Sequence, residues 1–196
     1  GWLWEIEDEI RSLVPMVYYH VWDNYPYPMF NKVWYDSCDY VGCISKVTHD
    51  IVKNVAPDVE SAYLPHAVNT NLFKPLPVEE KAGLREKMGV EQDKFVVFWN
   101  NRNARRKHPG TLIFWFKEFL EKVGRDKAKL VMHTDPKDVN GPNLLAIIDS
   151  LGLVNGEVQF STNKVDLIQL SAMYNMADVT VNISDAEGFG LSTLES

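Results

Sequence analysis

The end of the chain carries two glutamates on either side of a glycine-containing loop. In SDAEGFGLSTLES (184–196), Glu187 lies in the loop and Glu195 lies about a turn into the helix that we expect to follow. Glycine lets a backbone approach a ligand closely, and the first N–H groups of a helix carry partial positive charge. The pattern therefore indicates a loop for an anionic ligand, with the two carboxylates reaching different parts of it. A plain helix entry with an acidic first turn is the alternative, because a lone G-x-G is weak evidence.

A second group of chemically active residues is a basic cluster in an otherwise acidic chain. The segment NRNARRKHPG (101–110) contains Arg102, Arg105, Arg106, Lys107 and His108. Arginine presents a planar fork to phosphate oxygens and lysine a point charge, so together they can neutralise a diphosphate without a metal. The cluster predicts a phosphate-bearing ligand. On these residues alone, a solvated basic turn that caps the next helix is the alternative.

Both segments need elements that bring them to one place. Short apolar, β-rich runs predict strands at 16–22, 40–45, 61–68, 95–100, 129–134, 157–161 and 178–184. Amphipathic stretches predict helices at 46–55, 77–89, 109–124, 141–152 and 165–177. Alternating strands and helices form parallel β-α-β units, so we expect an α/β fold with a doubly wound sheet and strands buried on both faces. Ligands of such sheets bind beyond the carboxyl ends of the strands, where both segments lie.

The amino-acid composition and the positions of prolines and cysteines limit the class of protein. The 196 residues are 45% hydrophobic and 24% charged, which is typical of a water-soluble globular chain with room for one or two domains. Two prolines in NLFKPLPVEE (71–80) break both periodicities, so we place a domain change near residue 76. Cys38 and Cys43 lie in or beside an apolar run and are expected to be reduced core residues rather than a zinc site or disulfide framework.

Charge and hydropathy bear on partners and compartment. A formal net charge of −7 gives no general attraction to nucleic acid or anionic lipid. No apolar run approaches the ~20 residues that span a bilayer. The start, GWLWEIEDEIRSL, is acidic and amphipathic rather than a signal peptide, so the expected compartment is the cytoplasm.

Four motifs in order resemble retaining, nucleotide-sugar-dependent glycosyltransferases of the GT-B fold. EGFGLSTLE has that family's two glutamates, separated by seven residues around a GFG-like loop. NRNARRKHP is similar to its arginine and lysine pair spaced by five, matched by Arg102 and Lys107. YNMADVTVNIS resembles the strand before the signature, and YLPHAVNTNLFKP resembles the segment that joins the two GT-B domains. The resemblance covers the chain from about residue 38 to its end.

The resemblance implies roles for these positions. Arg102 and Lys107 would hold the donor diphosphate and stabilise it as the sugar departs, while Glu187 would bind a hydroxyl of the donor sugar. Glu195 would accept hydrogen bonds from the ribose hydroxyls. No metal and no cofactor is implied, because cations and a helix dipole supply the positive charge. The absence of a D-x-D motif agrees with that expectation.

Further positions complete the implied donor site. The backbone of Phe189, Gly190 and Leu191 would close over sugar and phosphate. The base would lie near the loop after the strand at 157–161, around Phe160 to Asn163, and Thr134 at a strand end is a candidate polar contact.

This chain also departs from the family's pattern. Ala67, Val68 and Asn69 stand where the family commonly has Gly-Val-Asp, which removes support for a donor or hinge role of that turn. His20 ends the first strand and can be compared with a histidine that some relatives place near the reacting sugar. A structural role is more usual for a strand-end histidine, and the same holds for His66 and His133.

We therefore expect a fragment of a retaining glycosyltransferase that is truncated at both ends. Residues 1–75 would form the last part of the N-terminal acceptor domain and 76–196 an incomplete C-terminal donor domain, both Rossmann-like. The partners would be a nucleotide-sugar donor, such as a UDP or GDP sugar, and an unknown glycan, lipid or small-molecule acceptor, with peripheral membrane contact left open and nucleic acid excluded. The fragment alone could be inactive. Two alternatives remain: a GT-B-fold sugar-nucleotide epimerase, which would be expected to lack the paired glutamates, and a non-catalytic nucleotide-binding module.

Overall fold

The computed structural model describes residues 1–196 and divides into two compact units. The first contains residues 1–67 and 186–190, and the second contains residues 68–185 and 191–196. The division falls after Ala67 rather than near residue 76, because the proline-containing segment packs on the second unit. There, the Ser171 hydroxyl donates to the Leu72 carbonyl at 2.8 Å and the Leu76 amide donates to the Asn175 side chain at 2.8 Å.

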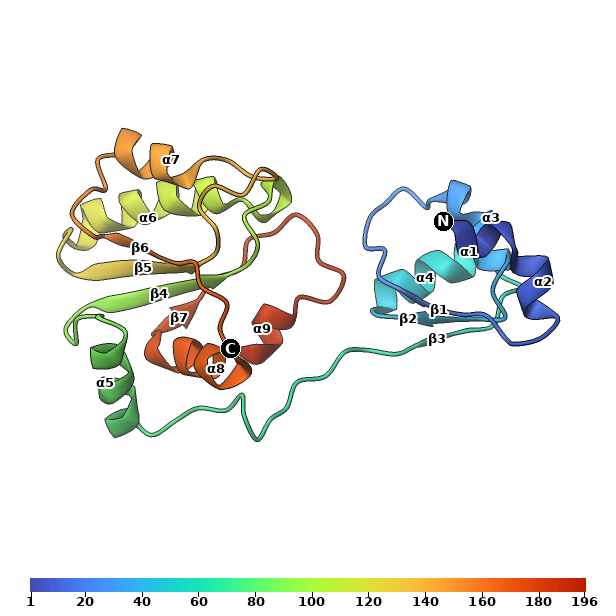
Figure 1. The fold of residues 1–196 in the computed structure, drawn as a ribbon. Helices are drawn as coiled ribbons and strands as arrows, with labels where there is room; N and C mark the ends of the chain where they lie inside the picture. Colours follow the sequence, from blue (N-terminus) through green and yellow to red (C-terminus); the bar gives the residue numbers. More distant parts are fainter. The chain divides into compact units, whose positions relative to one another are not determined.

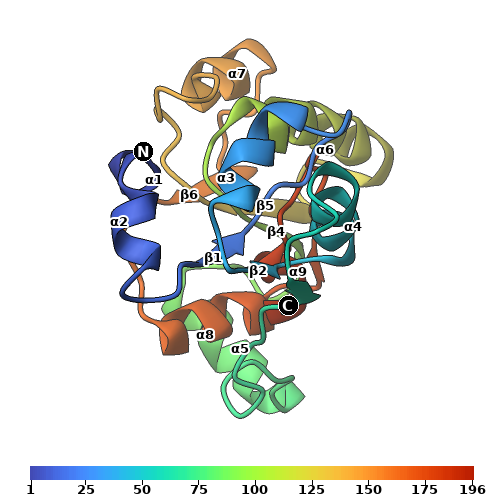
Figure 2. The same ribbon diagram turned by 90° about the vertical axis from the view of Figure 1, so that its right-hand side faces the viewer.

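The first unit is a small parallel sheet with short helices. Strands β1 (Val17–His20), β2 (Tyr40–Cys43) and β3 (Ser61–Tyr63) pair in the order β1-β2-β3. Helices α3 (Lys32–Asp36) and α4 (Lys46–Val55) cover one face of this sheet (Figure 2). The remaining helical segments are α1 (Trp2–Glu5), α2 (Glu7–Arg11) and the 3-10 turn η1 (Met29–Asn31).

Local sequence explains why α4 forms and where it packs. The Ser45 hydroxyl accepts a hydrogen bond from the Thr48 amide at 3.0 Å, which satisfies one of the free N–H groups at the helix start. Ile51, Val52 and Val55 are buried at helical spacing and form a core with Val41 of β2. Cys38 and Cys43 belong to the same core as free thiols, which confirms the prediction made for them.

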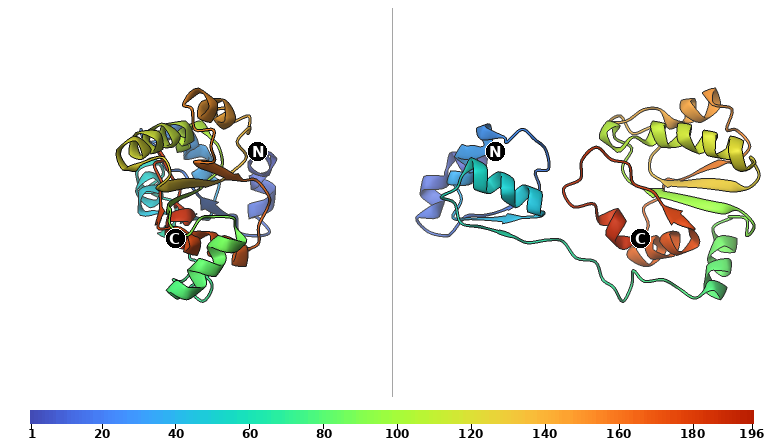
Figure 3. Two further views of the ribbon diagram at one scale, coloured as in Figure 1. Left: turned by 90° about the vertical axis from the view of Figure 1, so that its left-hand side faces the viewer. Right: turned by 180° about the vertical axis from the view of Figure 1, so that it is seen from behind.

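The second unit is a larger parallel sheet covered on both faces. Strands β4 (Phe95–Asn100), β5 (Ala128–His133), β6 (Val158–Ser161) and β7 (Val179–Thr180) pair in the order β6-β5-β4-β7. Helices α6 (Pro109–Val123) and α7 (Leu144–Ser150) lie on one face, and α5 (Val78–Lys87) and α8 (Leu167–Met176) lie on the other (Figures 1 and 3). The unit also contains the 3-10 turn η2 (Arg105–Lys107) and the short helix α9 (Leu191–Glu195).

Burial of the second sheet follows its apolar sequence. The interior residues of β4 and β5 are buried almost without interruption, including Phe98, Trp99 and Met132 at 0% exposure. Helices α6 and α7 bury Ile113 and Leu144 on one face, and α8 buries Met176 on the other. This confirms the expected doubly wound arrangement for the second unit. In the first unit only one face is covered, and Val17 and Tyr19 on β1 stay exposed.

The predicted elements are found with shorter ends. All seven predicted strands exist, but β3 is Ser61–Tyr63 rather than 61–68, and β7 is Val179–Thr180 rather than 178–184. All five predicted helices exist as well. No helix of the structure is both long enough and apolar enough to cross a membrane.

Candidate functional site

The carboxyl ends of the four strands in the second unit meet at one edge of its sheet. The register places Asn100 of β4 opposite His133 of β5, and His133 opposite Ser161 of β6. His133 Nδ1 and Ser161 Oγ lie 3.0 Å apart in a hydrogen bond. Burial lowers the pKa of His133, which favours the neutral form of the ring beside the Ser161 hydroxyl.

The basic cluster forms the loop that leaves this edge after β4. Residues 105–107 make the turn η2, within which Lys107 is buried. His108 follows in the left-handed region at φ 50°, a conformation that histidine adopts more readily than most side chains. Its Nε2 lies 2.7 Å from a carboxylate oxygen of Asp185, and the Asp185 amide donates to the Arg106 carbonyl at 2.9 Å. The basic loop is thereby tied to the segment that follows β7.

Arg102 has a partner that sequence reasoning did not predict. Its Nε donates to Asp138 Oδ2 at 2.6 Å and its terminal nitrogen to Asp138 Oδ1 at 3.3 Å. The Arg102 guanidinium, followed by hydrogen bonds from Asn140, holds the pKa of Asp138 below its usual range. The pairing uses the same fork geometry with which arginine binds phosphate. Since the Arg102 side chain is 66% exposed, the site keeps a cation accessible to solvent.

The loops after β4 and β5 pack closely against each other. Asn103 is fully buried, and its side-chain amide donates to the Pro142 carbonyl at 2.9 Å. A Cβ on Gly141 would lie 2.7 Å from the Asn103 carbonyl oxygen, so this position needs glycine. The contact fixes the loop that carries the cations.

The glycine loop falls into the first unit. Ala186–Gly190 groups with residues 1–67, which places Glu187, Phe189 and Gly190 there. The Phe189 ring meets His66 edge to face with centroids 5.7 Å apart, and a Cβ on Gly188 would lie 3.1 Å from the Val21 carbonyl oxygen.

Glu195 lies in the second unit and has a defined polar environment. The Tyr174 hydroxyl on α8 donates to Glu195 Oε2 at 2.9 Å and accepts from the Asn100 amide at 2.8 Å. Leu191, the first residue of the same short helix, is exposed. Sequence reasoning missed Tyr174 and Asn100, although Asn100 ends a predicted strand and Tyr174 lies in the segment YNMADVTVNIS.

The remaining candidates lie at strand ends. Phe160 on β6 is half-buried and packs against the core, whereas Asn163 beyond that strand is exposed. Thr134 is buried after β5; its amide donates to the Ser161 carbonyl at 3.0 Å and its hydroxyl has no protein partner.

His20 occupies the corresponding position in the first unit. It is buried at the end of β1 and hydrogen-bonded through Nε2 to the Tyr35 hydroxyl. Burial lowers its pKa to about 4, so its ring is neutral at pH 7. This setting is that of a packed histidine.

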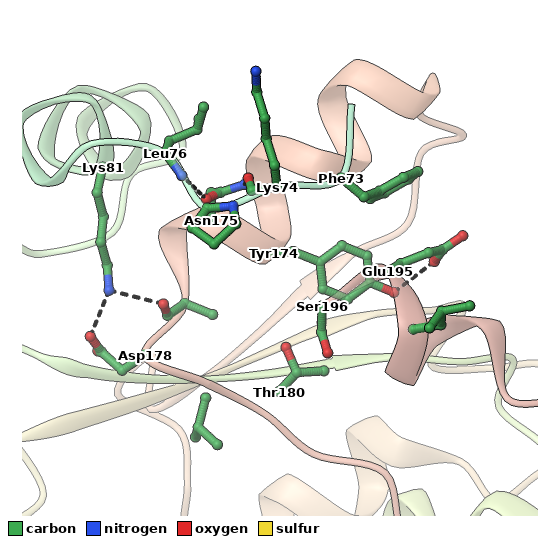
Figure 4. A pocket seen from close by; sticks show the side chains of 14 residues that line it. Phe73, Lys74, Leu76, Lys81, Tyr174, Asn175, Asp178, Thr180, Glu195 and Ser196 are labelled. Atoms are coloured by element: carbon green, nitrogen blue, oxygen red, sulfur yellow. Dashed lines mark hydrogen bonds and ion pairs between the residues drawn. The ribbon is translucent and has the colours of Figure 1, made fainter. Parts of the chain in front are cut away.

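A cavity of about 390 Å³ flanks Glu195 and Tyr174 (Figure 4). It runs along β7 toward the amino end of that strand, where Lys81 pairs with Asp178 at 2.8 Å. Parallel sheets bind ligands at the opposite, carboxyl edge, so we assign the cavity no part in binding at the basic loop. No group of three or more His, Cys, Asp or Glu side chains is placed to hold a metal ion.

Comparison with known proteins connects this architecture to one class. No known family model matches the chain. The chain is 26% identical over 179 residues to the alpha-monoglucosyldiacylglycerol synthase of Acholeplasma laidlawii, covering 85% of this chain and 41% of that protein. Among solved structures, Anabaena HepE in complex with UDP-glucose matches with a TM-score of 0.75 at 18% identity, over 95% of this chain and 52% of that one. A glycosyltransferase from Rickettsia africae matches with a TM-score of 0.67 at 22% identity, over 91% and 48%.

The chain has the GT-B fold.

Two parallel α/β sheets and a match over nearly its whole length confirm this expectation from the sequence. The GT-B neighbours are about twice as long, since the chain spans 41% of the Acholeplasma protein and about half of each solved chain. The basic loop and Glu195 lie in the second unit, whereas Glu187 and Phe189 lie in the first.

Proposed function

We propose that this chain is part of a glycosyltransferase that moves a sugar from a nucleoside diphosphate donor to an acceptor, with retention at the sugar. The observation that carries the proposal is the cation-bearing loop at the carboxyl edge of the second GT-B sheet, with Arg102 exposed and Lys107 buried beside it. HepE, which matches 95% of the chain, is described in complex with UDP-glucose, and this supports a uridine nucleotide.

The diphosphate would bind at the basic loop. Arg102 already holds a two-oxygen anion, the Asp138 carboxylate, and a diphosphate offers more charge to the same fork. We expect Arg102 to exchange Asp138 for phosphate oxygens when the donor binds. As the bond between sugar and diphosphate breaks, negative charge grows on the leaving group, and Arg102 and Lys107 stabilise it.

The other residues bind the rest of the donor. In the proposal Glu195 accepts hydrogen bonds from the ribose, and Glu187 binds a sugar hydroxyl. The backbone of Phe189, Gly190 and Leu191 covers sugar and phosphate. The base lies near Phe160 and Asn163, and Thr134 is available as a polar contact. These assignments rest on the motif resemblance together with the hydrogen-bonding groups that each position offers.

Several finer points belong to the proposal as well. Transfer is metal-independent, because side-chain cations supply the charge that a metal would otherwise provide. The compartment is the cytoplasm. The acceptor is a glycan, a lipid or a small molecule, with peripheral membrane contact in the lipid case.

Calorimetric titration of the 196-residue chain with UDP, GDP and ADP tests the proposal. We expect UDP to bind, and Arg102→Ala or Lys107→Ala to weaken it at least about tenfold, as charge-assisted phosphate contacts do. Lys127→Ala is the matched control, because Lys127 is an exposed, ion-paired cation at the amino edge of the same sheet. If none of the three nucleotides binds, the proposal is overturned.

The two alternatives have less support. The Acholeplasma relative is named an alpha-monoglucosyldiacylglycerol synthase and the Rickettsia structure a glycosyltransferase, and neither name is that of an epimerase or a binding module. The paired glutamates that an epimerase would be expected to lack are present at positions 187 and 195.

A further inference from the structure

Three polar side chains from separate elements form a hydrogen-bonded row in the second unit. Asn100 ends β4, Tyr174 lies on α8, and Glu195 ends α9. The Asn100 amide donates to the Tyr174 hydroxyl at 2.8 Å, and that hydroxyl donates to Glu195 Oε2 at 2.9 Å. Figure 4 shows the Tyr174 hydroxyl pointing at the Glu195 carboxylate. The row joins the carboxyl edge of the sheet to a predicted ligand-binding carboxylate.

The core fixes the position of the Tyr174 hydroxyl. Tyr174 is 7% exposed, and its ring meets Phe98 edge to face at 5.2 Å and Phe73 at 6.2 Å. A tyrosine has only two side-chain torsions, so packing the ring places the hydroxyl as well. The hydroxyl therefore lies at a fixed point that does not depend on Glu195.

Hydrogen-bond directions in the row are determined by chemistry. The Asn100 amide nitrogen can only donate, so the Tyr174 oxygen accepts from it. The single Tyr174 proton is then directed to Glu195, which as a carboxylate can only accept. Burial, with the Glu195 charge contributing, raises the pKa of Tyr174, so the hydroxyl stays protonated and remains a donor.

The Glu195 carboxylate is left with unused capacity. Tyr174 contacts one oxygen, and Oε1 has no protein hydrogen-bond partner. A carboxylate has about four acceptor positions, so the remaining ones suit a ligand that donates two neighbouring O–H groups. Glu195 is only half-buried, which leaves it accessible to such a ligand.

We propose that Tyr174, oriented by Asn100, is a positioning residue that holds one oxygen of Glu195 and so presents the carboxylate to the vicinal hydroxyls of a nucleotide ribose. This inference rests on the proposed function, in which Glu195 binds ribose. It adds that the preference for a ribose over a deoxygenated sugar depends on two residues that do not touch the ligand.

The test compares UDP with 2′,3′-dideoxy-UDP by calorimetry on the 196-residue chain. Wild type is expected to prefer UDP by about tenfold or more, because the hydroxyl contacts involve a charged acceptor. Tyr174→Phe keeps the ring and removes only the hydroxyl, and we expect it to reduce that preference to about twofold. Asn100→Ala, which frees the hydroxyl to rotate, is expected to reduce it partly and serves as the second variant. Tyr27→Phe is the matched control, since Tyr27 also donates to a carboxylate, that of Asp50 at 3.1 Å.

The outcomes separate this inference from the proposed function. UDP binding with an undiminished ribose preference in both Tyr174→Phe and Asn100→Ala overturns the positioning role alone. Failure of the wild-type chain to bind UDP overturns the proposed function, and the inference with it. Binding of inorganic pyrophosphate should be unchanged in Tyr174→Phe, because the row acts on the ribose contact only; a parallel loss there would indicate a general structural defect and overturn the positioning role.

Discussion

The two sheets of this chain are both parallel, but the side chains at their carboxyl edges differ. In the first unit the strand-end residue His20 is buried, neutral and hydrogen-bonded to Tyr35. In the second unit the strand-end residue Asn100 leads directly into a loop with four cations, of which Arg102 is 66% exposed. Parallel pairing makes the carboxyl edge of either sheet available to a ligand, and the second carries a cluster of four cations that suits an anion. The fold thus supplies the location, and the side chains decide whether it is used.

Separate cores are the first part of this comparison to test, with the largest expected effect. Ile113 on α6 and Ile51 on α4 are both fully buried, in clusters that share no residue. Ile113→Ala and Ile51→Ala should each lower the free energy of unfolding by about 3 kcal/mol. Hydrogen exchange should accelerate in β5 for the first variant and in β2 for the second. Equal acceleration of both strands by one variant would contradict separate cores.

The carboxyl edge of the second sheet, with its four cations, is tested next. The double variant Arg102→Ala with Lys107→Ala should weaken UDP binding about 100-fold, because two charge-assisted contacts to phosphate are lost. Calorimetry measures the affinity, and circular dichroism checks that the fold is retained. His20→Gln should leave UDP affinity within about twofold. If it weakens UDP as much as the double variant does, the assignment of the nucleotide to the second unit is wrong.

His20, at the carboxyl edge of the first sheet, predicts a pH dependence of stability. The pKa of His20 is lowered from 6.5 to about 4 in the folded chain, so the unfolded state takes up the proton first as pH falls. The contribution of neutral His20 to the free energy of unfolding is fully present above pH 6.5 and is lost progressively toward pH 4. Between pH 7 and pH 5 the loss should be about 2 kcal/mol. Denaturant unfolding of wild type and His20→Gln at both pH values measures this loss. If the free energy of unfolding falls equally in the two proteins between pH 7 and pH 5, His20 is not the cause.

The contact between His108 and Asp185, which joins two loops at the carboxyl edge of the second sheet, should have the smallest effect on stability. His108 Nε2 and a carboxylate oxygen of Asp185 lie 2.7 Å apart, and the two side chains are 38% and 68% exposed. Solvent screens such a pair, so Asp185→Asn should lower the free energy of unfolding by only about 0.5 kcal/mol. A double-mutant cycle with His108→Gln isolates the interaction. A coupling above about 2 kcal/mol would show that the loops are held more tightly than an exposed pair allows.

Much of the fold could be predicted from the sequence, because its signals are local. The continuous apolar run 95–100 is β4, and the helix predicted at 46–55 is α4, which begins at its Ser45 cap. Strand ends were less predictable. At β7 only Val179 and Thr180 pair with β4 as strand residues, so the apolar sequence continues beyond the regular pairing. The short helices α1 to α3 were not predicted, since four or five residues give little periodic signal.

The candidate site was predicted in part, and what was missed is long-range. The cations and glutamates stand out by type and spacing, yet the carboxylate that holds Arg102 comes from Asp138, 36 residues away. Tyr174 reaches Glu195 across 21 residues, and Asn100 reaches Tyr174 across 74. Such partners follow from how the strands and helices pack, which composition and periodicity do not specify.

Hydrogen exchange of the 196-residue chain with and without saturating UDP tests the central claim most directly. The claim is that the carboxyl edge of the second sheet binds a nucleoside diphosphate. We predict slower exchange in residues 101–108 and 191–195, and no change at the amino edge around residues 124–128. Protection confined to the amino edge or to the strands of the first unit, or no protection at all, would contradict it.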